Sequence, residues 1–113
     1  MSYLYTLDGK TPVAEPDSSK WADWWLKDKR SVRQGYMTVG VGVEATEVHV
    51  STVFLGMDCA LGEGPPMLFE TMVFYGPLDQ KQERCSTWDE AEKMHDLVCE
   101  RVRNRGSLTC LLK

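Results

Sequence analysis

Several patterns typical of enzymes are absent from this sequence. It has no glycine-rich loop with phosphate-binding spacing ahead of a helix, and it has no nucleophile elbow. None of the four cysteines forms a CxxC pair with another, which argues against a structural zinc site. Histidine is scarce, with only His49 and His95. We therefore expect neither a metal nor a cofactor, and no motif identifies a reaction.

Long apolar runs and a basic charge balance are also missing. No apolar run approaches the ~20 residues that a membrane-spanning helix needs. The first ten residues show no charged segment followed by an apolar core, so we expect no signal peptide. A net charge of −4 and a pI of about 5.1 disfavour a general nucleic-acid-binding protein. These absences predict a cytoplasmic protein with free thiols and without a membrane partner.

The residues that are present predict a single α+β domain spanning residues 1–113. With 42% hydrophobic residues, a chain of this length can bury a core without help from a metal or a disulfide. Residues 48–55 and 67–75 are rich in β-branched and aromatic side chains, which is typical of strands. Asp8-Gly9 indicates a hairpin near the start of the chain. We expect an antiparallel sheet of about four to five strands packed against two α-helices.

Two segments carry the signals of a helix start. Residues 16–19 (PDSS) offer several N-caps ahead of a tryptophan-rich segment that ends near residue 29. Thr87 and Glu90 form a capping box ahead of an amphipathic segment of about four turns. His95 falls on the apolar stripe of that second helix, and Gly106 is expected to end it.

The remaining segments are assigned by periodicity. Val39, Val41 and Val43 alternate with glycines, which predicts that the strand runs through residue 43 and that the turn follows at residues 44–47. Residues 78–85 are polar and are predicted to be a loop. Residues 67–75 are apolar on both faces except at Glu70, so this strand is expected to be covered twice. Because an unpaired buried charge is costly, the Glu70 carboxylate is then expected either to pair with an arginine or to lie at the more solvent-exposed end of the strand.

The candidate ligand-binding residues form two groups. The basic strip after the first helix suits an anion, and the indoles before it suit a stacked ring. The loop at residues 56–66 is longer than the usual hairpin connection and has three glycines and two prolines, which indicates a functional role. The candidates are Trp24, Trp25, Arg30 and Arg33 from the first group, and Asp58 and Glu63 from the loop.

A catalytic alternative uses a different set of side chains. If the long loop folds back over the sheet, Asp58 and Glu70 could meet His95 and provide acid–base chemistry. The competing interpretation is structural, because strand carboxylates are usually ion-pair partners and a histidine on an apolar stripe is usually a satisfied core residue. The three tryptophans are in the same way more typical of a clamp over a sheet than of a ligand site.

Three stretches together resemble a known family. They are VSTVFLGMD (residues 50–58), GPPMLFETMVFYG (residues 64–76) and QERCSTWDEAEKMH (residues 82–95). They resemble a family of small uncharacterised proteins encoded by bacteriophages and prophages. The family typically has a histidine where this chain has Cys59 and a tyrosine where it has Cys85, whereas His95 matches. The resemblance implies a phage protein acting in the host bacterial cytoplasm, and it brings no activity with it.

Three functions follow as hypotheses. The first is a non-enzymatic binding protein that inhibits a bacterial antiviral defence, either by sequestering a nucleotide signal or by masking a host defence protein. The second is a small phosphodiester hydrolase or nuclease that uses Asp58, Glu70 and His95. The third is a structural or interaction module, which would form a homodimer through its apolar tail or an edge strand.

Overall fold

The computed structural model describes residues 3–28, 30–60, 62 and 64–108. Along the chain the elements are β1 (Tyr5–Asp8), β2 (Thr11–Ala14), α1 (Ser18–Lys27), β3 (Ser31–Val39), the short 3₁₀ helix η1 (Gly42–Glu44), β4 (Thr46–Phe54), β5 (Phe69–Phe74), β6 (Gln82–Cys85) and α2 (Trp88–Leu108). The predicted ligand-binding residue Glu63 lies outside the described residues, and so do residues 109–113 of the apolar tail.

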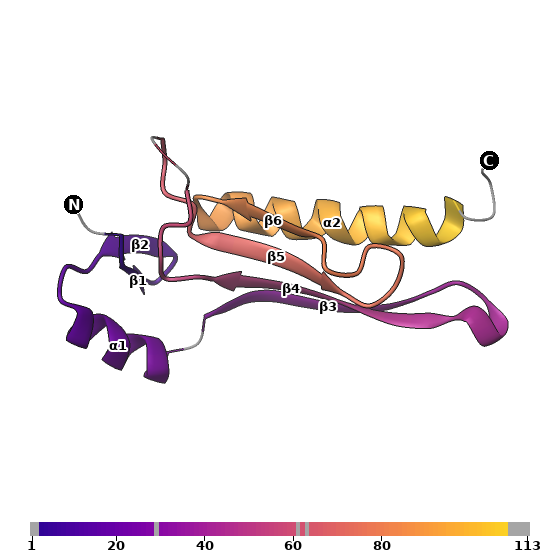
Figure 1. The fold of residues 1–113 in the computed structure, drawn as a ribbon, viewed down its shortest axis with the longest axis horizontal. Coiled ribbons are helices and arrows are strands. Elements are labelled where there is room, and N and C mark those ends of the chain that lie inside the picture. The colour runs from indigo at the N-terminus through magenta and orange to yellow at the C-terminus, as the bar shows by residue number, and fades with distance from the viewer. Residues whose placement is uncertain (1–2, 29, 61, 63, 109–113) are drawn as a thin grey trace.

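A four-stranded antiparallel sheet with the order β3-β4-β5-β6 forms the body of the molecule, and β1 and β2 form a separate hairpin. Helix α2 runs along one face of the sheet, whereas α1 and the hairpin lie together near one end of it (Figure 1). The predicted α+β class, with an antiparallel sheet packed against helices, is confirmed.

The core lies between the sheet and α2 because alternate strand residues point to that side. The buried residues of these elements are Val48, Val50, Thr52 and Phe54 from β4, Phe69, Thr71 and Val73 from β5, and Ala91, Met94, His95, Val98, Cys99 and Val102 from α2. Helix α2 starts with the predicted capping box: the Thr87 hydroxyl accepts from the Glu90 amide at 3.1 Å, and the Glu90 carboxylate accepts from the Thr87 amide at 3.1 Å.

Helix α1 is attached to the end of the sheet by its indoles. The Asp17 carboxylate caps its first turn. The Trp21 indole N–H donates to the carbonyls of Tyr5 and Gly56 at 3.1 and 3.0 Å, and Trp24 packs edge-on against Phe54 at 5.7 Å between ring centroids. Trp21 and Trp24 therefore hold α1 against the end of the sheet, as the clamp interpretation predicts.

Three predictions about the elements are wrong: the end of one strand, the end of one helix, and one segment taken for a loop. The strand predicted to run through residue 43 ends at Val39, because Gly40 and Gly42 adopt φ values of +87° and +61° and make the turn themselves. Residues 82–85, predicted as loop, pair with β5 as an edge strand. Helix α2 continues to Leu108, beyond the stop predicted at Gly106.

The face of the sheet opposite α2 is covered by no described helix, so β5 is covered once rather than twice (Figure 1). On that face Tyr36, His49 and Phe74 form a row across three strands, with ring centroids 4.4 and 5.5 Å apart. Glu70 also lies there and accepts from the Arg84 guanidinium at 2.9 Å. Of the two alternatives expected for Glu70, an arginine partner or the more solvent-exposed end of the strand, the structure shows the arginine partner.

Candidate functional site

A buried chain of three polar side chains crosses the core beneath α2. The Thr71 and Thr52 hydroxyl oxygens are 2.5 Å apart, and the Thr52 hydroxyl is 2.7 Å from Nδ1 of His95. Thr52 and Thr71 are fully buried and His95 is 4% exposed. Since a buried polar group without a partner is costly, this chain satisfies three groups that the apolar core could not otherwise hold.

A groove of about 430 Å³, here called the β3 groove, opens between α2 and the edge strand β3. It is lined by Arg33, Gly35, Tyr36 and Met37 of β3 and by His95, Asp96, Cys99, Glu100 and Arg103 of α2. Arg33 donates to the Asp96 carboxylate across the groove. Arg103 has no ion-pair partner among the described residues.

Gly35 is the reason that His95 reaches this groove. A Cβ atom at position 35 would lie 3.3 Å from Nε2 of His95 and 3.5 Å from Sγ of Cys99. The missing side chain leaves room for the imidazole between α2 and β3. Nδ1 is held by Thr52, so Nε2 is the ring nitrogen that faces Gly35 and the groove.

Burial sets the charge state of the groove's floor. Desolvation lowers the pKa of His95 from 6.5, and the Arg33 guanidinium lowers it further, so the imidazole is neutral at physiological pH. Burial also raises the pKa of the Cys99 thiol, which keeps it protonated. Neutral His95 can donate or accept a hydrogen bond at Nε2, whereas a protonated Cys99 is a poor nucleophile.

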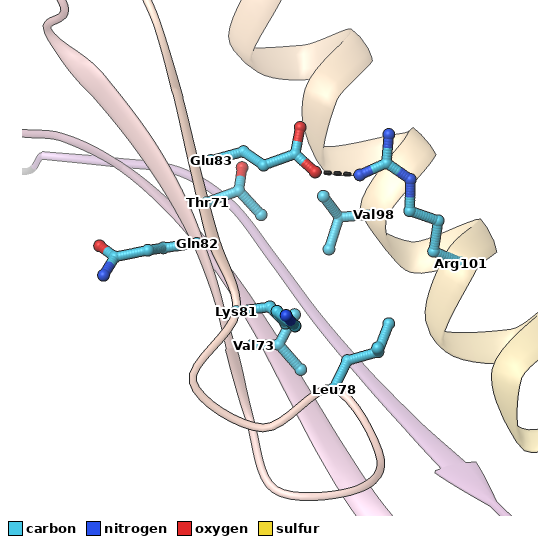
Figure 2. Close-up of a pocket in the computed structure, with 8 residues that line it drawn as sticks. All are labelled: Thr71, Val73, Leu78, Lys81, Gln82, Glu83, Val98 and Arg101. Carbon is cyan, nitrogen blue, oxygen red and sulfur yellow. Dashed lines mark hydrogen bonds and ion pairs between the residues drawn. The ribbon is translucent and has the colours of Figure 1, made fainter.

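A second cavity of about 200 Å³, here called the β6 pocket, lies on the other flank of α2. It is lined by Thr71, Val73, Leu78, Lys81, Gln82, Glu83, Val98 and Arg101. Figure 2 shows Val98, Val73 and Leu78 pointing into the space between the helix and the strands, with the Glu83–Arg101 ion pair across one end. Thr71 lines this pocket and His95 lines the β3 groove, so the buried chain joins the two cavities.

The tryptophans and arginines predicted to bind a ligand occupy different surroundings. Trp25 is stacked by the Arg30 guanidinium at 3.5 Å, and Nε of Arg30 is buried without a hydrogen-bond partner among the described residues. Trp24 packs on Phe54 in the core. Of this group, Arg33 alone lines the β3 groove. The structure therefore does not assemble the predicted indole–arginine site as one cavity.

The predicted catalytic group is also dispersed. Glu70 lies on the open face of the sheet, paired with Arg84, while His95 lies on the opposite face beneath α2. One oxygen of Asp58 accepts from the amides of Ala60 and Met67 and so closes the neck of the long loop. These three side chains form no cluster. Among the described residues, no group of three or more His, Cys, Asp or Glu side chains could hold a metal ion.

Sequence reasoning missed the residues that build the two cavities. His95 was singled out, but its partners Thr52 and Thr71 lie on strands 43 and 24 residues away, and their register decides the contact. The strand periodicity of residues 48–55 places Thr52 on the buried face, where a threonine needs a partner. The need of the buried Thr52 hydroxyl for a hydrogen-bond partner was the signal in the sequence that could have identified the Thr71–Thr52–His95 chain.

Comparison of the chain with protein-family models, with curated proteins and with solved structures gives no match. None of the helices in the described part of the chain is both long enough and apolar enough to span a membrane. The functional argument therefore depends on the geometry of the two cavities.

Proposed function

We propose that this protein is a non-enzymatic binding protein whose β3 groove holds a nucleotide-like ligand. One observation carries the proposal: a groove of about 430 Å³ brings two guanidinium groups, two carboxylates and a neutral buried histidine together. Arginine binds phosphate oxygens through two parallel hydrogen bonds. Carboxylates accept from the amino and hydroxyl groups of a base and a ribose. A nucleotide has both kinds of group, so it suits a groove of mixed charge.

The protonation states in the groove support binding rather than nucleophilic catalysis. Burial holds the Cys99 thiol of the groove protonated. Outside the groove, burial together with Glu90 raises the pKa of the Cys85 thiol on β6 to about 11. The carboxylates proposed for a hydrolase, Asp58 and Glu70, are engaged by backbone amides and by Arg84. The hydrolase alternative consequently lacks an assembled acid–base pair.

The wider role expected from the phage resemblance belongs to this proposal. A protein that sequesters a nucleotide signal in the β3 groove would inhibit a bacterial defence that depends on that signal. Masking of a host protein is the alternative, and it is favoured by the long edge of β3. This edge spans nine residues, from Ser31 to Val39, and pairs with no described strand. A second copy of the chain could pair along the same edge.

The test is a thermal shift measurement with adenosine 5′-monophosphate, guanosine 5′-monophosphate and the matching nucleosides. A nucleotide should raise the melting temperature, because a ligand that binds only the folded state stabilises it. Arg103→Ala should weaken the apparent affinity for the nucleotide at least tenfold and so reduce the shift in melting temperature. This is the loss expected for a hydrogen bond to a charged group, which contributes roughly 1.5–3 kcal/mol. Arg101→Ala is the matched control, since Arg101 lies on the same helix but lines the β6 pocket.

Equal loss in the two arginine variants would contradict the groove as the site. No stabilisation by any nucleotide would contradict the ligand class. Light scattering on the same samples tests the edge-strand alternative, and a strict monomer at high micromolar concentration would remove the homodimer.

A further inference from the structure

The β6 pocket has the composition of a small ligand site that the proposed function does not use. Its apolar walls come from Val73, Leu78 and Val98, and Thr71 lies at one end. Lys81 forms no ion pair with any described residue. The volume of about 200 Å³ is several times the ~30 Å³ share of a liquid water molecule. Because Glu83 and Arg101 neutralise each other in an ion pair, Lys81 leaves the pocket with a net positive charge beside its apolar walls, and this combination matches a short-chain carboxylate.

We propose that the β6 pocket binds a small carboxylate with a short apolar chain, and that the Thr71–Thr52–His95 chain couples its occupancy to the hydrogen-bonding state of His95 in the β3 groove. The inference goes beyond the proposed function and stands without it, because its readout is the His95 ring itself. It depends on three observations: the two hydroxyls are 2.5 Å apart, the Thr52 hydroxyl is 2.7 Å from Nδ1 of His95, and Nε2 faces Gly35.

The coupling follows from counting donors along the chain. Each threonine hydroxyl has one proton, and neutral histidine has one N–H. In one arrangement Thr71 donates to Thr52, Thr52 donates to Nδ1, and the His95 proton sits on Nε2. In the other, Nδ1–H donates to Thr52, Thr52 donates to Thr71, and Thr71 donates into the β6 pocket. The hydroxyls turn together, because each of the two hydrogen bonds in the chain holds one proton.

A carboxylate in the β6 pocket selects the second arrangement. It has only acceptors, so it accepts a hydrogen bond from the Thr71 hydroxyl and favours the His95 tautomer with the proton on Nδ1. Acid–base exchange with water removes the Nε2 proton and places one on Nδ1. Nε2 then becomes an acceptor toward the β3 groove. The empty pocket leaves both arrangements open, so binding on one flank of α2 changes what the other flank can bind.

The experiment is nuclear magnetic resonance of ¹³C,¹⁵N-labelled protein at about pH 7.5, with butyrate as the probe and butylammonium as the matched cation. Butyrate should shift the methyl signals of Val73, Leu78 and Val98, while Lys81 and Arg101 repel butylammonium. The His95 ring should move toward the Nδ1–H tautomer by about fivefold in the tautomer ratio, the change that one net hydrogen bond produces. Lys81→Gln should weaken butyrate binding.

Variants of the Thr71–Thr52–His95 chain separate butyrate binding from its coupling to the His95 ring. Thr71→Val removes the hydroxyl at the pocket end without touching the Thr52–His95 contact, and it should abolish the tautomer change. Thr52→Ser keeps a hydroxyl and should preserve the change. Butyrate binding with an unchanged His95 ring would overturn the coupling. Unchanged pocket methyl signals at the highest soluble butyrate concentration would overturn the site, whatever nucleotides do in the β3 groove.

Discussion

The two cavities differ although they flank the same turns of α2. The β3 groove is about twice as large as the β6 pocket and carries charges of both signs, whereas the β6 pocket has mostly apolar walls. Gly35 explains part of the difference, since a side chain there would fill the space beside His95. The comparison shows that one helix on one sheet can present two chemically distinct sites when its two borders are packed differently.

The largest expected effect comes from cutting the link that the two cavities share. Thr52→Val keeps the shape of the side chain but leaves Nδ1 of His95 and the Thr71 hydroxyl without a partner. Each unsatisfied buried group costs about 1–3 kcal/mol, so for the two groups we expect a loss of about 2–6 kcal/mol in the free energy of unfolding. Urea denaturation measures it.

The control for this variant is Thr38→Val. Thr38 is exposed on β3, where the same exchange leaves no buried group unsatisfied and should change stability by less than about 0.5 kcal/mol. If Thr52→Val is as mild as Thr38→Val, the hydrogen bonds of the chain do not hold the core together.

A smaller effect should appear in the dependence of stability on pH. The pKa of His95 is lowered in the folded protein by burial and by Arg33, with Asp96 acting in the opposite direction. The unfolded chain therefore binds more protons below about pH 6.5, so the contribution of His95 is fully present above that pH. It is lost as the pH falls, with a slope of at most about 1.4 kcal/mol per pH unit.

The measurement is urea denaturation between about pH 7.5 and 5.5 for the natural chain and for His95→Gln. Subtracting the two profiles cancels the pH dependence that carboxylates titrating in this range contribute to both proteins. The difference should shrink as the pH falls below about 6.5. A difference that is independent of pH would mean that His95 is accessible to water and titrates normally.

Local signals in the sequence were enough to predict the α+β class and the helix starts. The Thr87–Glu90 capping box and the Asp8-Gly9 hairpin each involve residues a few positions apart, and both predictions are confirmed. Residues 16–19 offered several N-caps for the first helix, and Asp17 is the one that caps it. The turn at Gly40 and Gly42 was misplaced because two glycines suit either a bare strand face or a turn, and only their positive φ values decide.

Most of the candidate site could not be predicted from the sequence, for a different reason. The β3 groove needs Arg33 and Gly35 from one edge strand to lie opposite Asp96 and Arg103 of a helix about 60 residues later. Sequence reasoning selected Arg33 and His95 from their residue types alone. It grouped Arg33 with Trp24 and Trp25, its neighbours in sequence, because long-range packing leaves no periodicity to read.

The most direct test of the account is to observe the hydroxyl protons of Thr52 and Thr71 by nuclear magnetic resonance. The account predicts two resolved hydroxyl signals that exchange slowly with water, with a nuclear Overhauser contact from the Thr52 hydroxyl to the His95 ring. Hydroxyl signals averaged with water, as for a threonine on the surface, would contradict a buried chain that joins the two cavities.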